Sequence, residues 1–391
     1  MTIEASKGEA GAARIRLGMV GGGQGAFIGA VHRIAARIDD QFELVAGALS
    51  SDPERARASA AEIGLDPRRS YGSFAEMAAA EAARPDGIEA VAIVTPNHVH
   101  APAAKAFLAA GIHVICDKPM TLTVPEAEDL VAAAEASGKL FVLTHNYTGY
   151  PMIRQARDLV ASGELGEIRL IQVEYAQDWL SEPLERAGSK QAEWRTDPAR
   201  SGAGGSIGDI GTHAYNLASF VAGREAEELL AQLTAFVPGR ALDDDVQILL
   251  RYAGGARGML WASQVAVGNE NALRLRVYGT KAGIDWSQEE PNRLWFTRLG
   301  EPKQLLTRGG AGAVPAAARV TRVPAGHPEG YLEGFATLYA EAARAIRAAR
   351  AGGAVPADVI YPTVRDGLAG MRFIAAAVAS SAAGNVWTRV T

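Results

Sequence analysis

The feature that most constrains the fold of this chain is an alternation of apolar runs of strand length with alanine-rich stretches of helix length, from Ile15 to about His145. This alternation is typical of βαβ units, in which helices connect the strands of a parallel sheet. We therefore predict a Rossmann domain over residues 15–148, after a flexible tail at 1–14. The predicted strands are Ile15–Val20, Phe42–Leu49, Ala90–Thr95, His113–Cys116 and Leu140–Thr144, and the predicted helices are Gly29–Ile38, Pro53–Ile63, Ser73–Ala83, Pro102–Ala110 and Val124–Ser137.

The pattern changes after Tyr150, where strands follow one another without helices between them. Consecutive strands of this kind predict an antiparallel sheet. We expect an α/β chain whose second domain, residues 149–391, has an open, mostly antiparallel sheet, a long loop or mobile flap at Leu305–Val323, and a terminal helix able to pack back on the first domain. The predicted strands are Ile168–Gln177, Leu230–Val237, Val246–Tyr252, Ala256–Val265, Ala272–Tyr278 and Arg293–Leu299, and the predicted helices are Pro151–Ser162, Tyr331–Ala351 and Thr363–Ala379.

The composition restricts the partners of the chain. A net charge of −5 and a pI near 5.9 provide no basic excess for nucleic acid. Cys116 is the only cysteine, which excludes an intramolecular disulfide and a C-x-x-C metal site. No window approaches 18 uninterrupted apolar residues, and the first residues lack the apolar stretch of a signal peptide. These features predict a cytoplasmic protein without a membrane or nucleic-acid partner.

A glycine-rich turn, VGGGQGAFIGAVHR at 20–33, follows the first predicted strand. Glycines let the backbone approach a pyrophosphate, whose charge the following helix N-terminus stabilises. We predict a dinucleotide site formed by Gly21, Gly23, Gln24 and Gly29, with a plain glycine turn as the alternative. The glycine spacing is irregular, so the loop is expected to be longer than usual.

The end of the second strand is expected to select between NAD and NADP. Dinucleotide folds usually place an acid there for the ribose 2′-hydroxyl, but here Ser50 occupies that position. Arg55 lies one helical turn on and could reach a 2′-phosphate, or it could be a solvated helix residue. Asp52 could bind the ribose or cap the next helix. The choice between the two cofactors stays open.

Lys118 stands at the end of the strand predicted in GIHVICDKPM at 111–120. It is one of only seven lysines among 39 basic residues. Ligands of a Rossmann sheet bind beyond the carboxyl ends of its strands, so Lys118 is expected beside a nicotinamide. A partly desolvated ammonium can stabilise alkoxide character while hydride leaves the carbon. The alternative is an ordinary surface lysine paired with Asp117.

Asp209 and His213 stand four residues apart in a glycine-rich segment. On a helix both would lie on one face, where the carboxylate can orient the imidazole or bind a second substrate hydroxyl while the histidine takes a proton. A capped, structural helix start is the alternative. No further ligands stand nearby, so no metal site is predicted. Tyr147, Arg195 and His327 are weaker candidates for substrate binding.

Four motifs in order along the chain resemble those of the Gfo/Idh/MocA oxidoreductases, which include glucose–fructose oxidoreductase and inositol dehydrogenases. They are VGGG…G at 20–29, TPNHVH at 95–100, DKP at 117–119 and GDIGTH at 208–213. The resemblance implies catalytic roles for Lys118, Asp209 and His213, with His213 as the base. It implies that Thr95, Asn97 and His100 lie along NAD or NADP. Asp117 departs from the family pattern, which has glutamate there.

The resemblance further implies oxidation of a secondary hydroxyl of a sugar or cyclitol, and a homodimer or homotetramer formed through the open sheet. Some family members are NAD-dependent glycoside hydrolases that act by transient ring oxidation and elimination, and this remains an alternative activity. A cofactor-sensing or structural protein is a third possibility, although it would not need the Lys, Asp and His set.

Overall fold

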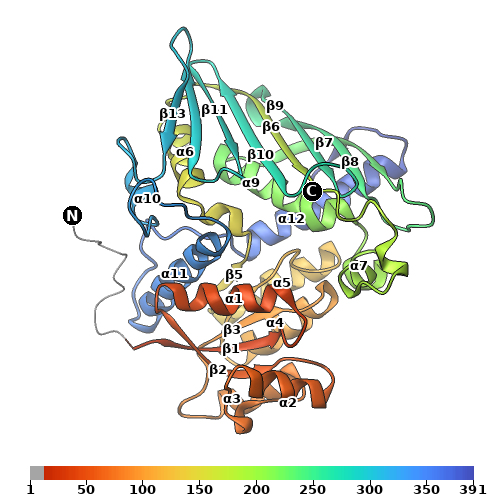
Figure 1. Cartoon of the computed structure of the whole chain (residues 1–391), viewed down its shortest axis with the longest axis vertical. Coiled ribbons are helices and arrows are strands. Elements are labelled where there is room, and N and C mark those ends of the chain that lie inside the picture. Colours follow the sequence, from red (N-terminus) through yellow and green to blue (C-terminus); the bar gives the residue numbers. More distant parts are fainter. Residues whose placement is uncertain (1–12) are drawn as a thin grey trace.

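The computed structural model describes residues 13–391, and the predicted tail lies outside the described residues up to residue 12. The chain forms two sheets, one at each end of the molecule, with helices between them (Figure 1). The first is a parallel sheet of five strands in the order β2-β1-β3-β4-β5, which confirms the Rossmann prediction. Its strands are β1 (Ile15–Gly21), β2 (Phe42–Ala48), β3 (Ala90–Val94), β4 (His113–Cys116) and β5 (Phe141–Leu143).

The helices of this half start where the sequence provides caps. Asp52 and Ser73 cap two of them, and Thr123 forms a capping box with Glu126 at a third. The first helix instead begins after Ala26 without a side-chain cap, so its free N–H groups face the glycine loop. The helices are α1 (Phe27–Ile38), α2 (Pro53–Glu62), α3 (Phe74–Ala82), α4 (His100–Ala109) and α5 (Val124–Ser137).

The second sheet has nine strands in the order β13-β12-β11-β10-β6-β9-β8-β7-β14. Every neighbouring pair is antiparallel except β6 and β9, which confirms the predicted open, mostly antiparallel sheet. Its strands are β6 (Ile168–Ala176), β7 (Ala226–Thr234), β8 (Asp245–Tyr252), β9 (Arg257–Ser263), β10 (Ala272–Gly279), β11 (Ala282–Ser287), β12 (Arg293–Arg298), β13 (Gln304–Thr307) and β14 (Thr388–Arg389).

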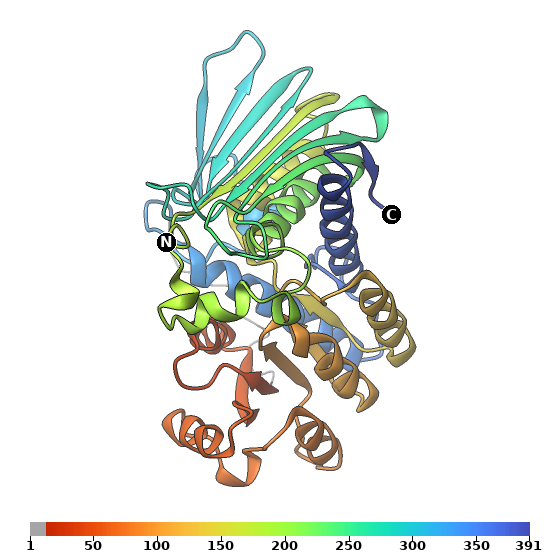
Figure 2. The same ribbon diagram turned by 90° about the vertical axis from the view of Figure 1, so that its right-hand side faces the viewer.

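Helices cover one face of this sheet and leave the other open (Figure 2). The covering helices are α6 (Pro151–Ala161), α9 (Thr212–Ala222) and α12 (Val364–Ala382). Tyr215 of α9 stacks on Phe373 of α12 with ring centroids 4.1 Å apart, and Trp286 of β11, which is 1% exposed, packs against Tyr150. The apolar core of this half therefore lies between the helices and one face of the sheet.

Helix α11 (Tyr331–Arg350) connects the two halves, because it packs along α1. His32 of α1 contacts Tyr339 of α11 through its Nδ1, 2.8 Å from the hydroxyl oxygen. Arg322, ahead of α11, pairs with Asp39 at the end of α1 at 2.5 Å. The nucleotide loop at the start of α1 is thus held against the second half of the chain.

The prediction of a long loop over Leu305–Val323 is wrong. The segment begins in β13, contains α10 (Pro315–Ala318), and is held by the buried pair between Arg308 and Glu329 at 2.9 Å. Two further differences are that β11 was not predicted, although Ala282, Ile284 and Trp286 alternate with Gly283 and Asp285 as in a half-buried strand, and that β7 begins four residues before the predicted strand. No helix within residues 13–391 is long and apolar enough to cross a membrane.

Candidate active site

The glycine loop between β1 and α1 has the backbone that a phosphate cradle needs. Gly21, Gly22 and Gly25 have φ values of 79°, 71° and 77°, a region that favours glycine. A Cβ on Gly29 would lie 2.4 Å from the Cα of Gly22, so helix and loop touch only because both residues are glycine. Helix α1 begins at Phe27, two residues before the predicted start, and Gly29 therefore lies inside its first turn.

A cavity of about 370 Å³ opens over this loop. The Gln24 amide N–H donates to Ser59 Oγ at 3.0 Å, and its side chain donates to Glu62 at 2.9 Å. The positive glycine φ values, the uncapped N-terminus of α1 and the cavity fit a bound pyrophosphate. The cavity is lined by Gly22, Gly23, Gln24, Gly25, Ala26, Phe27, Ala30, Arg33, Leu49, Ser59, Glu62 and Ile63.

Replacing Gly23 by valine is expected to abolish dinucleotide binding. A Cβ at Gly23 would lie 2.7 Å from both the Leu49 carbonyl oxygen and Ser59 Oγ, so the loop would have to move away from β2 and α2. Calorimetric titration with NAD⁺ should show no binding, while circular dichroism keeps the wild-type spectrum. Gly353→Val is a matched control, because Gly353, like Gly23, has no positive φ, and a Cβ there meets only the Ala348 carbonyl oxygen at an ordinary 3.6 Å. An unchanged NAD⁺ affinity in Gly23→Val would contradict the assignment of the loop.

The second strand ends in a small hydrogen-bonded turn. Ser50 Oγ accepts from the Asp52 N–H at 3.1 Å, and the Asp52 carboxylate accepts from the Arg55 N–H at 2.8 Å. Asp52 is therefore the N-cap of α2, one of the two roles considered for it. Arg55 is exposed, with no side-chain bond to another described residue, and its role toward a ribose stays a prediction.

The TPNHVH segment connects the two halves. The Asn97 side chain donates, at 3.0 Å, to the carbonyl oxygen of Ser201, the last residue of α8 (Pro198–Ser201) in the second half of the chain. The two ring nitrogens of His100 lie 2.8 Å from the carbonyl oxygens of Pro119 and Thr95. Burial lowers the pKa of His100, and the two carbonyl oxygens oppose that change. Thr95 Oγ1 is buried and has no partner among the described residues.

Lys118, directly after β4, reaches across to the second half of the chain. Its Nζ lies 3.0 Å from Asp209 Oδ1 and also donates to the Asp209 carbonyl oxygen. Asp209 Oδ2 accepts from Arg195 Nε at 3.1 Å and from Gln264 Nε2 at 2.9 Å. Burial alone would raise the pKa of Asp209, but the charges of Lys118 and Arg195 outweigh it and hold that pKa well below its usual value. The carboxylate is ionised, and it fixes the lysine at the edge of the Rossmann sheet.

Asp117, beside Lys118, points away from this contact. Its Oδ1 lies 3.2 Å from His32 Nε2 and 2.5 Å from Thr144 Oγ1. Burial would raise the pKa of Asp117, and the interactions with His32 and Thr144 lower it overall. Asp117, which stands where the family pattern has glutamate, therefore bonds to His32 and Thr144 inside the first half of the chain. The alternative pairing of Lys118 with Asp117 is not seen.

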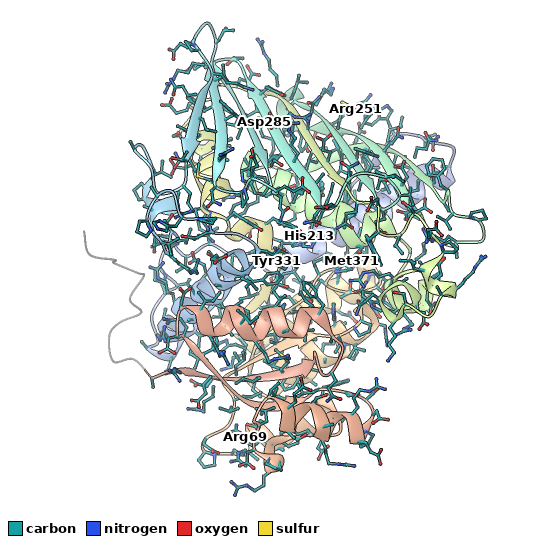
Figure 3. All side chains as sticks on the ribbon, viewed as in Figure 1. Arg69, His213, Arg251, Asp285, Tyr331 and Met371 are labelled. Atoms are coloured by element: carbon teal, nitrogen blue, oxygen red, sulfur yellow. The ribbon has the colours of Figure 1, made fainter. Side chains whose placement is uncertain are left out.

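His213 lies in the space between the two sheets (Figure 3). It is 9% exposed, and the ring of Tyr147 packs against it at 4.9 Å and 73°. Burial, followed by the charge of Lys118 and the neighbouring His145, lowers the pKa of His213 well below the ordinary value of 6.5. The imidazole is thus neutral at pH 7 and able to accept a proton.

The expected contact between Asp209 and His213 is not formed. The segment Ile207–Gly211 is a π-helical turn ahead of α9, so residues four apart are not superposed as they would be on an α-helix. Within residues 13–391 the Asp209 carboxylate bonds to Lys118, Arg195 and Gln264, and not to the histidine. Of its two expected roles, orientation of the imidazole is excluded in this structure and contact with substrate stays a prediction.

The weaker candidates differ in their positions. Arg195, on α7 (Lys190–Arg195), joins the cluster through Asp209 and lies over the Trp194 ring at 4.2 Å. Tyr147 is buried, and its hydroxyl oxygen lies 2.5 Å from that of Tyr175. His327 is exposed on the loop before α11, where its ring contacts the Pro324 carbonyl oxygen, so the structure does not bring it to the cluster.

Residues that the sequence analysis did not single out also belong to this cluster. His145 follows β5 and contacts His213, and its strand-end position could have revealed it by the same argument as for Lys118. Gln264 follows β9 and binds Asp209, and no sequence signal connects these two residues. A larger cavity of about 700 Å³ opens beside Trp261 and contains none of these residues.

The Rossmann sheet has a glycine loop that fits a pyrophosphate and a lysine at a strand end, and the second half of the chain brings a carboxylate and a neutral histidine near that lysine. This combination defines a dinucleotide-dependent oxidoreductase. Residues 15–156 match the family model for the oxidoreductase family with an NAD-binding Rossmann fold, and residues 153–285 match that for a GFO/IDH/MocA C-terminal domain. The chain belongs to the GFO/IDH/MocA family of oxidoreductases, as its motifs predicted.

Three relatives illustrate the relationship. An oxidoreductase from Sinorhizobium meliloti is 59% identical, with a TM-score of 0.88 over 97% of this chain and 100% of that one. An inositol dehydrogenase homolog from Azotobacter vinelandii, solved with NADH and myo-inositol, is 39% identical, with a TM-score of 0.91 over 97% and 98%. Levoglucosan dehydrogenase of Pseudarthrobacter phenanthrenivorans is 28% identical over 72% of this chain and 75% of its own.

Proposed function

We propose that this protein oxidises a ring secondary hydroxyl of a cyclitol or sugar, with NAD⁺ as the hydride acceptor. The observation that supports this best is that Lys118, after the carboxyl end of β4, bonds to Asp209 and lies close enough to His213 to lower its pKa. The relatives named for inositol and levoglucosan support the substrate class.

The two halves of the reaction divide between His213 and Lys118. The neutral imidazole of His213 takes the hydroxyl proton, which its lowered pKa leaves it free to do. The Lys118 ammonium donates a hydrogen bond to the same oxygen as negative charge develops there. When bound, the nicotinamide supplies the acceptor for the hydride that leaves the carbinol carbon.

The surrounding residues would hold the substrate ring. Asp209 anchors Lys118, and its position beside Arg195 allows the pair to bind a neighbouring hydroxyl. Tyr147 is buried and its ring packs edge to face against His213, so it supports the base from one side, while its contact with substrate stays a prediction. For the cofactor we propose NAD over NADP, because the neighbours were solved with NAD⁺ or NADH and Ser50 is bonded within its own turn.

A substrate panel tests this proposal. Purified protein with NAD⁺ and, separately, NADP⁺ would be mixed with inositols, monosaccharides, anhydrosugars and glycosides, and reduced nicotinamide followed by its absorbance. We expect net NADH formation with at least one cyclitol or sugar. Release of sugar from a glycoside without net NADH would favour the NAD-dependent hydrolase instead. Cofactor binding without turnover of any compound would favour a cofactor-sensing protein.

We also propose a homo-oligomer formed through the open face of the large sheet. Five apolar side chains point from this face: Leu170, Leu249, Met259, Tyr278 and Trp295, each between 37% and 53% exposed. The pairings of Met259 with Leu249 and of Leu170 with Tyr278 place them beside one another. On the same face Arg274 pairs with Asp285 and Arg276 with Glu174, so apolar pairs and ion pairs share it. A mixed surface of this kind fits a subunit interface.

The expected mass in light scattering at micromolar concentration is that of a dimer or tetramer. Replacing both Met259 and Leu249 by lysine should shift the measured mass toward that of the monomer. The two new charges would be buried in a symmetric interface and would face the same two charges of the partner copy. Replacing the exposed Leu299, on the turn after β12, by lysine is the control and should leave the mass unchanged. A monomer mass for the wild-type chain would contradict the oligomer.

A further inference from the structure

His213 has a hydrogen-bonding partner that is not a carboxylate. Its Nδ1 lies 3.4 Å from Nδ1 of His145, and the two rings meet edge to face at 5.3 Å and 82°. His145 is 2% exposed, so water does not compete for this contact. The carboxylate expected to orient His213 is occupied by Lys118, Arg195 and Gln264. The imidazole pair is therefore what fixes the ring of the base.

A contact between two Nδ1 atoms links the tautomers of the two rings. Only one of the two nitrogens can carry the hydrogen of a bond between neutral imidazoles, and the other must accept it. If His145 were the donor, His213 would carry its own hydrogen on Nε2 and have no lone pair free for a substrate proton. If His213 is the donor, its Nε2 is unprotonated, and within residues 13–391 that atom bonds to no other group.

We propose that His145 is the positioning residue of the catalytic base: its Nδ1 accepts the Nδ1–H of His213 and so keeps the lone pair of His213 on Nε2, toward the substrate. This inference rests on the proposed function, because it assumes that His213 acts as the base. During the reaction the substrate proton moves to His213 Nε2, and the resulting imidazolium keeps its Nδ1–H directed at His145. The separation of 3.4 Å is long, as catalytic hydrogen bonds often are before substrate binds.

Several features hold the His145 ring in place and keep it neutral, as an accepting Nδ1 requires. Its N–H donates to the Leu143 carbonyl oxygen, and its own carbonyl oxygen accepts from Thr148 Oγ1 at 2.8 Å, so the backbone is fixed on both sides. Burial, followed by the charge of Lys118, lowers the pKa of His145 to about 3, while Asp117 opposes this shift. The ring stays neutral across the working pH range. The titratable groups that face the pair are Asp117, Lys118, Tyr147, Tyr175 and Asp209.

Nitrogen NMR of the histidine rings tests this assignment without turnover. The chain has seven histidines, which can be labelled with ¹⁵N and assigned by single substitution. His113 is an internal reference, because its Nδ1 accepts from the Leu140 N–H at 3.0 Å and must be unprotonated. With NAD⁺ present at pH 7.5, we expect the Nδ1–H form for His213 and the Nε2–H form for His145. An Nε2–H form or an equal mixture at His213 would overturn the inference.

Two replacements of His145 separate positioning from packing. Asparagine can place an oxygen where Nδ1 lies, whereas phenylalanine fills the volume without an acceptor. We expect His145→Phe to lower kcat roughly 10- to 100-fold and to give a tautomer mixture at His213, and His145→Asn to retain most of the rate. Equal rates in His145→Phe and wild type, or a slower His145→Asn than His145→Phe, would contradict the role.

The proposed function and the role of His145 are tested by different measurements, turnover for the first and ring tautomers for the second. A wild-type chain that forms no NADH with any cyclitol or sugar would refute that function, yet the ring tautomers would still be measurable. Conversely, net NADH formation together with an Nε2–H form at His213 would leave the dehydrogenase standing and remove His145 from its mechanism.

Discussion

Replacing Lys118 by methionine is expected to lower kcat by roughly 10²–10³-fold, the usual scale for losing one preorganised donor to a developing oxyanion. Methionine keeps the unbranched shape of the side chain, one atom shorter, and removes its charge. Because Nζ contacts Asp209 and not the glycine loop, the Kd for NAD⁺ should be nearly unchanged. Stopped-flow measurement of NADH formation and calorimetric titration with NAD⁺ check the two halves of this prediction. An unchanged kcat would remove Lys118 from the chemistry.

The matched control is Lys105→Met, on α4. Lys105 is also paired with an aspartate, Asp129, at 3.2 Å, but at the protein surface. Its replacement should leave both kcat and stability unchanged, since exposed pairs contribute about 0–1 kcal/mol. Lys118→Arg keeps the charge but replaces a compact ammonium by a planar fork, so we expect it to restore little of the rate.

A second variant separates the catalytic and structural roles of Lys118. Lys118→Met leaves the Asp209 carboxylate with Arg195 and Gln264 alone, which should destabilise the fold by about 1–3 kcal/mol, less than for a fully buried pair because both side chains are partly exposed. Adding Asp209→Asn would leave the Arg195 guanidinium without its carboxylate and should lower the stability further in denaturant unfolding. Lys118→Arg keeps a cation beside Asp209, so it should recover part of the stability and little of the rate. A rate that recovered in step with the stability would mean that Lys118 acts only through the structure.

The fold was predictable because its signals are local. Strand β3 reads AVAIV and is buried along its whole length, as a central parallel strand should be, and the caps Asp52, Ser73 and Thr123 mark three helix starts. Strand β11 was missed although Ala282, Ile284 and Trp286 alternate with Gly283 and Asp285, the period of two that a half-buried strand shows. What no local pattern shows is the bond that Asp285 accepts from Arg274 across the open face. That partner belongs to the neighbouring strand, which the pattern of one segment cannot reveal.

The site was predictable only where position along a strand decides it. Lys118 follows β4 directly, and the rule that ligands lie beyond strand ends places it correctly at the sheet edge. The relation of Asp209 to His213 depends instead on helix type, and the π-helical turn at Ile207–Gly211 changes it. The contacts of Gln264 with Asp209 and of His145 with His213 join residues 55 and 68 positions apart. Such contacts arise from packing of the two halves and have no counterpart in local sequence.

The pH dependence of oxidation should differ from that of an ordinary histidine base. The base must be neutral, so the rate is on a plateau above the pKa of His213 and falls as pH drops through it. Burial, Lys118 and His145 lower that pKa, and the falling limb should therefore lie well below pH 6.5. Removing the positive charge in Lys118→Met should raise the pKa and move the limb to higher pH.

Replacing His213 by alanine is expected to lower kcat by roughly 10²–10⁴-fold, the usual contribution of a general base, with little effect on the Kd for NAD⁺. The acid limb should disappear with the ring. The substitution also leaves a space beside Tyr147 and His145 that added imidazole can fill. Imidazole should restore part of the rate in His213→Ala and none in Lys118→Met, because only the first variant lacks a base.

The rescued reaction carries its own check. Dissolved imidazole is not held under the charge of Lys118 before it binds, so the restored rate should rise with pH through an ordinary imidazole pKa of about 6.5. The wild-type limb lies lower because the protein disfavours the charged ring. If His213→Ala kept the wild-type rate and limb, another group would be the base, and Lys118 or Tyr147, the latter 4.9 Å from the His213 ring, would be the next to test.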